Sequence, residues 1–187
     1  MALRQLLERL VKLRLKRHMT NKGLLTLATL LAASLLATET ASGQTVNSVY
    51  AVYNGMSVKV GMSIKDVGKP LSVEVKTDPI MRKQIVESTF KNGLVVSTLP
   101  EKGVTDLIYQ IDLFDPLVIL SNGLHTGMSE QDLSKRMGQP GGSGVDQGRR
   151  YISYYYYDAG GNLELILIAY INPSGEVEQL ELATPII

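Results

Sequence analysis

The 187-residue chain contains no cysteine and only two histidines, which excludes several kinds of site. Without cysteine there is no disulfide and no thiolate ligand for a structural zinc ion, although small proteins outside the cytoplasm often depend on disulfides. His125 is the only histidine after residue 43. A lone histidine in a turn, with no oriented nucleophile and acid, makes neither a metal site nor a catalytic triad. The folded part must therefore be stabilised by a hydrophobic core.

Phosphate-binding and calcium-binding motifs are also missing. Residues 138–148 (GQPGGSGVDQG) are rich in glycine but lack the Gly-Lys-Ser/Thr ending of a phosphate loop, so we expect a flexible loop from a helix to a strand. Asp112 and Asp115 lie close in sequence, but not in the ligand spacing of an EF-hand. We predict no catalytic residue, no metal and no cofactor. A hydrolase that relies on Asp and Glu alone is the remaining enzymatic alternative.

The N-terminus has the three zones of a secretory signal. Residues 1–22 are basic, residues 23–37 (GLLTLATLLAASLLA) are apolar and uncharged, and residues 41–43 (ASG) are small, as a signal peptidase requires. We therefore predict cleavage before Gln44 and export to the periplasm or the extracellular space. The mature chain would then have no N-terminal cysteine for lipid attachment.

Three alternatives concern the same region. The apolar run could be retained as a membrane anchor, but it covers fifteen residues, whereas a spanning helix needs about twenty. The basic zone is long for a signal, so Met19 is a candidate for the true start. Alternatively, residues 2–17 form a basic amphipathic helix on a membrane surface. The protein would contact a membrane only through this region, and only if it is not cleaved.

Removal of residues 1–43 changes the charge of the protein. The remainder holds twelve Lys and Arg against sixteen Asp and Glu, a net charge of −4. A chain with that balance has no general attraction for a phosphate backbone, so nucleic acid is excluded as a partner.

An internal repeat organises the rest of the chain. Residues 61–67 (GMSIKDV) recur as residues 127–133 (GMSEQDL). In each copy Ser and Asp lie three positions apart, the spacing of a capping box at the start of a helix. Each copy also follows an Asn-Gly pair and precedes a Gly-x-Pro sequence that ends the helix, at residues 54–55 and 68–70 in the first copy and at 122–123 and 138–140 in the second.

The repeat predicts an α+β fold. We expect two tandem repeats, residues 44–121 and 122–187, each with a short helix followed by a three-stranded antiparallel meander. The second helix is expected at Glu130 to Met137. The expected strands are 84–91, 94–98 and 104–113 in the first repeat, and 150–158, 163–171 and 176–182 in the second.

The segment GMSEQDLSKRMGQP, followed by a tyrosine-rich strand, a second strand and EVEQLEL, resembles a repeat of the SmpA/BamE and beta-lactamase-inhibitor-protein superfamily. The resemblance covers residues 122–183 well and 55–113 weakly. It implies an exported protein that binds another protein, in envelope assembly or in enzyme inhibition. The lipoprotein cysteine of the assembly factor is missing here, and no helix is evident before either GMS.

Four consecutive tyrosines, residues 154–157, are the unusual feature of the second repeat. Assuming a two-residue Gly160-Gly161 turn, Tyr157 faces Glu164, and one side of the hairpin carries no charge. That side is the predicted core: Ile152, Tyr154, Tyr156, Leu163, Leu165, Leu167 and Ala169. The opposite side is a candidate partner-binding surface, because exposed aromatic residues are enriched at interfaces: Tyr151, Tyr155, Tyr157, Ile166, Ile168 and Tyr170.

Two simpler explanations exist for these tyrosines. Tyrosine has a high strand propensity, and the patch would be core if it packed on the other repeat. The preferred function is an exported, non-enzymatic protein-binding module whose partner is another exported or envelope protein. A structural envelope protein, or a domain that binds a small ligand without catalysis, is the alternative.

Overall fold

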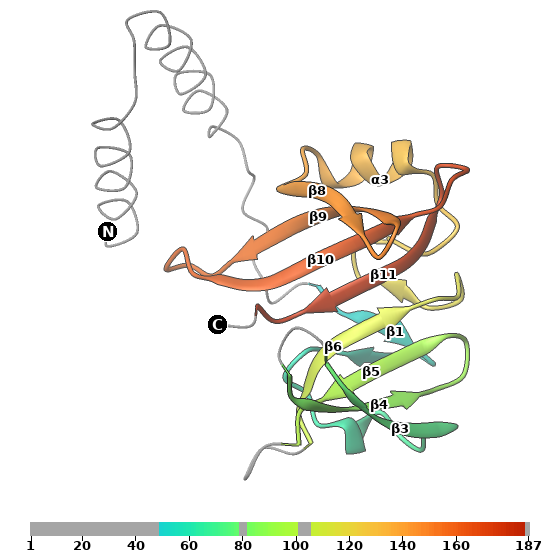
Figure 1. Ribbon diagram of the computed structural model, residues 1–187, viewed down its shortest axis with the longest axis vertical. Helices are drawn as coiled ribbons and strands as arrows, with labels where there is room; N and C mark the ends of the chain where they lie inside the picture. The colour runs from blue at the N-terminus through green and yellow to red at the C-terminus, as the bar shows by residue number, and fades with distance from the viewer. Residues whose placement is uncertain (1–48, 79–81, 101–105, 186–187) are drawn as a thin grey trace, which may run out of the picture. The chain divides into compact units, whose positions relative to one another are not determined.

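The computed structural model describes residues 49–78, 82–100 and 106–185 of the chain (Figure 1). The predicted signal, residues 1–43, lies outside them. The helices within these ranges include none that is both long and apolar enough to cross a membrane.

Most of the described chain forms one large antiparallel sheet, and a small second sheet lies beside part of it (Figure 1). The three strands of the small sheet run in the order β2 (Met56–Val58), β1 (Ala51–Tyr53) and β7 (Ile119–Leu120). The large sheet has eight strands, in the order β3 (Ser72–Thr77), β4 (Gln84–Thr89), β5 (Leu94–Thr98), β6 (Ile108–Leu113), β11 (Val177–Ala183), β10 (Leu163–Ile171), β9 (Arg149–Tyr157) and β8 (Gly142–Asp146).

The predicted fold class, α+β with two helix-plus-meander repeats, is wrong. The described residues contain one α-helix, α3 (Glu130–Met137), and one turn of 3-10 helix, η2 (Ile64–Asp66). Each half gives four strands to the large sheet, because residues 72–77 and 142–146 are edge strands that we did not predict. The fold is therefore mainly β, and the two halves meet through the antiparallel pair β6–β11.

Both GMS segments nevertheless make the same backbone contacts. The N–H of Gly61 donates to the carbonyl of Ile108 at 2.7 Å, and the N–H of Ile108 donates to the carbonyl of Met62 at 2.9 Å. The second copy repeats both bonds, at the same lengths, between residues 127–128 and Val177. Each GMS segment thus fixes the start of the last strand of its half of the sheet.

Helix α3 begins and ends where the sequence predicts. Ser129 caps it, since its Oγ accepts the N–H of Asp132 at 3.1 Å and donates to the Asp132 carboxylate at 2.8 Å. Leu133 is fully buried against the core, and Gly138 follows the last residue with φ +75°. The shorter first copy supports only η2, where the Ser63 Oγ accepts the N–H of Lys65.

Loss of the cap should measurably weaken the fold. We expect Ser129→Ala to lower the free energy of unfolding by about 1 kcal/mol, because the N–H of Asp132 loses its acceptor. Ser63→Ala is the matched control and should cost less, since η2 spans only three residues. Urea denaturation of the two variants measures both values, and an equal loss in each would contradict this role for Ser129.

A single hydrophobic core lies between one face of the large sheet, here called the inner face, and the layer formed by the small sheet, η2 and α3. Tyr53 of β1 meets Phe90, after β4, edge to face with ring centroids 6.1 Å apart. The turn after Phe90 is tight, because Asn92 and Gly93 both have positive φ (55° and 63°), as a two-residue Asn-Gly hairpin turn requires. The opposite face of the large sheet is here called the outer face.

Candidate functional site

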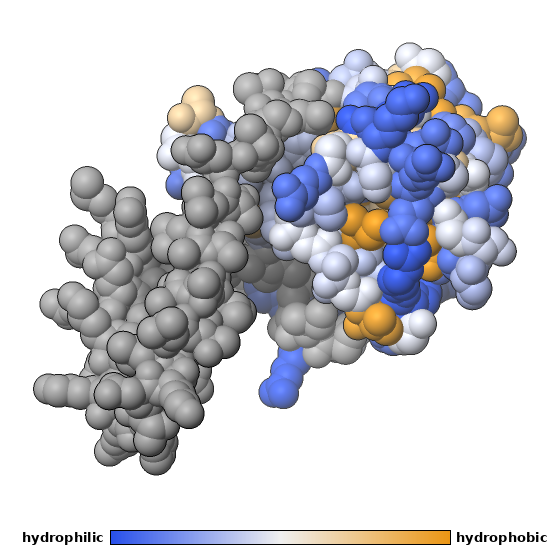
Figure 2. Space-filling model, turned by 90° about the horizontal axis from the view of Figure 1, so that it is seen from above, coloured by the Kyte–Doolittle hydropathy of each residue, from blue (hydrophilic) through white to orange (hydrophobic). Residues whose placement is uncertain are grey.

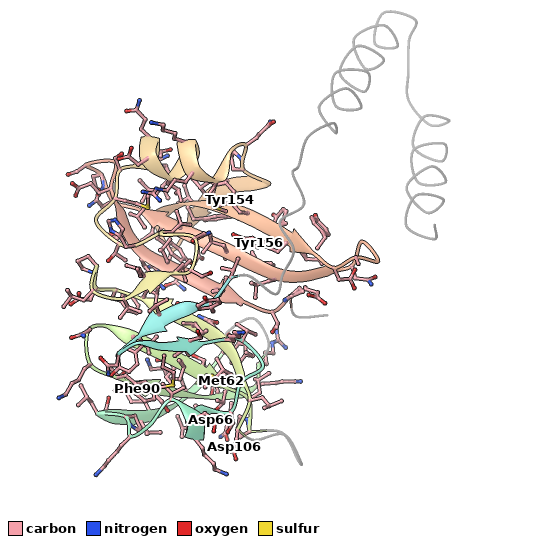
Figure 3. All side chains as sticks on the ribbon, turned by 180° about the vertical axis from the view of Figure 1, so that it is seen from behind. Met62, Asp66, Phe90, Asp106, Tyr154 and Tyr156 are labelled. Atoms are coloured by element: carbon pink, nitrogen blue, oxygen red, sulfur yellow. The ribbon has the colours of Figure 1, made fainter. Side chains whose placement is uncertain are left out.

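The β9–β10 hairpin has one buried side and one partly exposed side. Tyr154 and Tyr156 are 4% and 1% exposed and belong to the core cluster, together with four of the other five residues predicted there; Leu163 is half-buried (Figure 3). The prediction of which side faces the core is confirmed in this respect.

The register also follows the prediction over most of the hairpin. Tyr155 lies opposite Ile166, and Tyr151 opposite Tyr170. Tyr157, however, lies opposite Leu163 and not Glu164 as predicted. The assumed two-residue turn is the cause, because the chain reverses over Asp158 to Asn162, with the carboxylate of Asp158 accepting the N–H of Asn162 at 2.7 Å. The longer loop is followed by a register shift between Leu163 and Leu165.

The six predicted partner-binding residues differ in their access to solvent. Tyr155 and Tyr157 are 39% and 38% exposed, and Tyr151, Ile166 and Ile168 are half-buried. Tyr170 departs from the expectation, since only 6% of it is exposed. We call the accessible set the outer patch: Tyr155, Tyr157, Ile166 and Ile168.

Tyr170 is buried because other side chains of the outer face enclose it. The Arg149 guanidinium lies 4.1 Å from the centre of its ring, and the ring of Tyr151 lies 6.3 Å away, centroid to centroid. Its hydroxyl donates to the carboxylate of Glu181 at 3.3 Å. Tyr170 therefore supports the outer face from within and does not present its ring to a partner.

The middle of the glycine-rich segment 138–148, which we predicted to be a flexible loop, is the edge strand β8 (Gly142–Asp146). Its glycines leave room for tyrosine rings of the neighbouring strand β9. A Cβ on Gly141 would lie 2.4 Å from a ring carbon of Tyr155, and one on Gly144 would lie 2.8 Å from the hydroxyl of Tyr151. The rings cover an edge strand with few side chains of its own, an arrangement known to stabilise glycines in sheets.

A polar network, exposed at Arg149 and buried at Gln179 and Asp112, continues the outer face from β9 to β6. Arg149 donates to the Oε1 of Gln179 at 2.6 Å, and the Nε2 of Gln179 donates to Asp112 at 2.8 Å. The second oxygen of Asp112 accepts from Gln110 at 2.9 Å. The first two bonds join β9 to β11 and β11 to β6, and the third joins two residues of β6. The network therefore holds the centre of the outer face rigid.

A second acidic residue, Glu181 on β11, lies directly opposite Asp112 on β6 in the register of the sheet. Burial raises the pKa of Asp112 to about 6. Burial, with a smaller contribution from the charge of Asp112, raises the pKa of Glu181 to about 7. Burial disfavours the charged form of a carboxyl group, so both groups take up protons more readily than exposed ones do.

The residues weighed for catalysis remain apart from this face. The Nδ1 of His125 lies 2.7 Å from the carbonyl oxygen of Thr126, its neighbour in the turn. Within the described ranges, no three His, Asp or Glu side chains are grouped as a metal site would need. The outer face offers partly exposed aromatic and aliphatic side chains beside a group of hydrogen-bonded polar side chains.

Comparison with protein-family models gives no match for the chain, and neither curated proteins nor solved structures match it significantly. The function must accordingly be argued from the outer face itself.

Proposed function

We propose that the protein is an exported, non-enzymatic protein-binding module that contacts its partner through the outer patch. The observation that carries the proposal is the pair of partly exposed tyrosines, Tyr155 and Tyr157, beside Ile166 and Ile168 on two paired nine-residue strands. Aromatic side chains with few rotamers lose little entropy on binding and dominate the energy of many interfaces.

The setting of the patch supports binding in two ways. The Tyr155 ring is oriented by its contact with Gly141 and by a 3.3 Å hydrogen bond to the Ser153 hydroxyl, so it is held in place before a partner arrives. The hydrogen-bonded network of Arg149, Gln179 and Asp112 borders the patch on the same face. Export rests on the charge and hydropathy pattern of residues 1–43, and binding to a protein agrees with the SmpA/BamE-like resemblance.

Figure 2 shows one face of the molecule coloured by hydropathy. Hydrophobic side chains there form separate spots among hydrophilic ones (Figure 2). Single exposed apolar residues are normal on a protein surface, whereas a contiguous aromatic and aliphatic group is typical of an interface.

Site-specific photocrosslinking in the native cells tests the proposal. A benzophenone amino acid at position 157 should give a crosslinked product of discrete mass with another protein. The same group at position 117 is the matched control and should give none, because Leu117 is 72% exposed but lies in the β6–β7 connection, outside the patch. Once the partner is identified, Tyr157→Ser should raise the dissociation constant of the complex about thirtyfold, and Leu117→Ser should leave it unchanged. Equal crosslinking at both positions, or none at 157, would contradict the proposal.

A further inference from the structure

The edge strand β3 presents an uncovered strip of apolar side chains. Leu71, Val73 and Val75 are 65%, 57% and 64% exposed. Val73 pairs with Ser88, which pairs in turn with Val96 of the core, so the strip lies on the inner face of the sheet. All six residues of β3 are exposed, and among the described strands only β4 pairs with it.

The other side of β3 carries charges in alternation. Glu74 and Lys76 both point to the outer face, since Glu74 pairs with Glu87 and Lys76 with Ile85. Lys76 forms ion pairs with Glu87 and, at 3.4 Å, with Glu74. β3 is thus a free strand edge with valines on one face and a Glu–Lys pair, two residues apart, on the other.

We propose that two copies of this chain associate through antiparallel pairing of their β3 strands, around a two-fold axis that passes beside Val75. In this register Val75 lies opposite Val75 of the second copy, Glu74 lies opposite Lys76, and Val73 lies opposite Thr77. Unpaired backbone groups of each edge find partners, as in other cases of strand addition.

Charge selects this register over the next one. A shift by two residues also keeps the valines on one face, but it places Glu74 opposite Glu74 of the second copy, and like charges directly opposite are destabilising. The chosen register gives two Glu74–Lys76 pairs related by the axis, so the interface is self-complementary, as two-fold symmetry requires.

The second free edge, β8, is a poorer candidate for such pairing. Gly142 and Gly144 give it no side chains on the outer face, and rings of β9 cover that face. Val145 is its one large exposed apolar residue. A six-residue strand pair buries less area than a stable dimer normally does, so we expect a weak dimer that depends on protein concentration.

Cysteine crosslinking tests the register directly, because the chain has no cysteine of its own. In an antiparallel pair, Cα atoms of opposed residues lie about 4.5 to 5.5 Å apart, within disulfide range. Purified full chain with Val75→Cys should therefore form a covalent dimer under mild oxidation. Val73→Cys is the matched control on the same strand and should not, since the two copies of residue 73 are four positions out of register.

Charge exchange gives a second, independent measurement. Glu74→Lys should raise the dimer dissociation constant about tenfold, and adding Lys76→Glu should restore it, as measured by analytical ultracentrifugation. Circular dichroism establishes that each variant is folded. Crosslinking of Val73→Cys as strong as that of Val75→Cys, a disulfide between Val75→Cys and Val145→Cys molecules, or a folded Val75→Cys variant that stays monomeric would overturn the proposal. None of these outcomes depends on the outer patch.

Discussion

The free energy of unfolding should be about 4 kcal/mol higher at pH 5 than at pH 8. The cause is the pair Asp112 and Glu181, whose folded-state pKa values are raised to about 6 and about 7. Both lie well above the values near 4 of an unfolded chain, so the folded state binds protons more tightly. The stability from these groups is fully present below the unfolded pKa values and is lost as pH rises through about 6 to 7.

The neighbouring charges do not reverse this direction. Arg149 faces both carboxyl groups and favours their ionised forms, but Glu87 faces Asp112, and Asp146 faces Glu181, with the opposite effect. The Tyr170 hydroxyl and the amides of Gln110 and Gln179 complete the surroundings. Burial is the largest influence on each group, and it disfavours the charge.

Urea denaturation at a series of pH values measures the effect. The double variant Asp112→Asn, Glu181→Gln serves as the control, because it keeps every other titratable group and should flatten the profile between pH 5 and pH 8. A wild-type profile that is flat, or that rises with pH over this range, would show that burial does not raise the pKa values of the two carboxyl groups in the folded protein.

Gly141→Ala, directly before β8, should destabilise the protein by about 2 kcal/mol, although Gly to Ala normally stabilises where the backbone permits it. The added Cβ would lie 2.4 Å from one ring carbon of Tyr155 and 2.7 Å from another, so the ring has to move. Ser143→Ala, on the exposed part of β8, is the matched control and should change stability by less than about 0.5 kcal/mol.

A double-mutant cycle identifies the ring as the cause. In a Tyr155→Ser background the clash is gone, and Gly141→Ala should then cost little or nothing. Thermal or urea unfolding of the four proteins provides the cycle. If Gly141→Ala costs the same in both backgrounds, the loss comes from the backbone of β8 and not from the tyrosine.

The parts of the fold that sequence analysis found are those with local signals. Helix α3 has a capping serine and a terminating glycine, and β5 and β10 have the residue bounds that we expected. The inner and outer sides of the β9–β10 hairpin follow from alternation alone. These features depend on residues close together in sequence.

The features that sequence analysis missed depend on distant partners. β1, β2 and β7 have two or three residues each, too few to show a period. From its sequence β8 resembles a loop, because its glycines have no side chains. The rings of Tyr151 and Tyr155, which fill that space, belong to another strand. The predicted fold class was wrong for this reason: β3 and β8 each add a fourth strand to a predicted meander, β1, β2 and β7 form a second sheet, and residues 64–66 form only one turn of 3-10 helix.

The hydrogen-bonded network of the outer face could not be predicted from the sequence either. Gln179 and Asp112 are 67 residues apart, and Arg149 is 30 residues from Gln179. The one available signal was the alternation in β11, where Gln179 and Glu181 flank the buried Leu180. Alternation shows that these side chains share a face, but not which strand lies beside them.

The strand order of the large sheet leaves only one of its strand pairs distant along the chain. Neighbours in that sheet are consecutive along the chain everywhere except at β6–β11, so the other pairs close only short loops. The β6–β11 pair alone brings together residues such as Asp112 and Gln179, 67 positions apart. Loop-closure entropy grows only slowly with loop length. The wide sheet therefore has mostly local contacts, a property that favours rapid folding and is unusual for a mainly β protein.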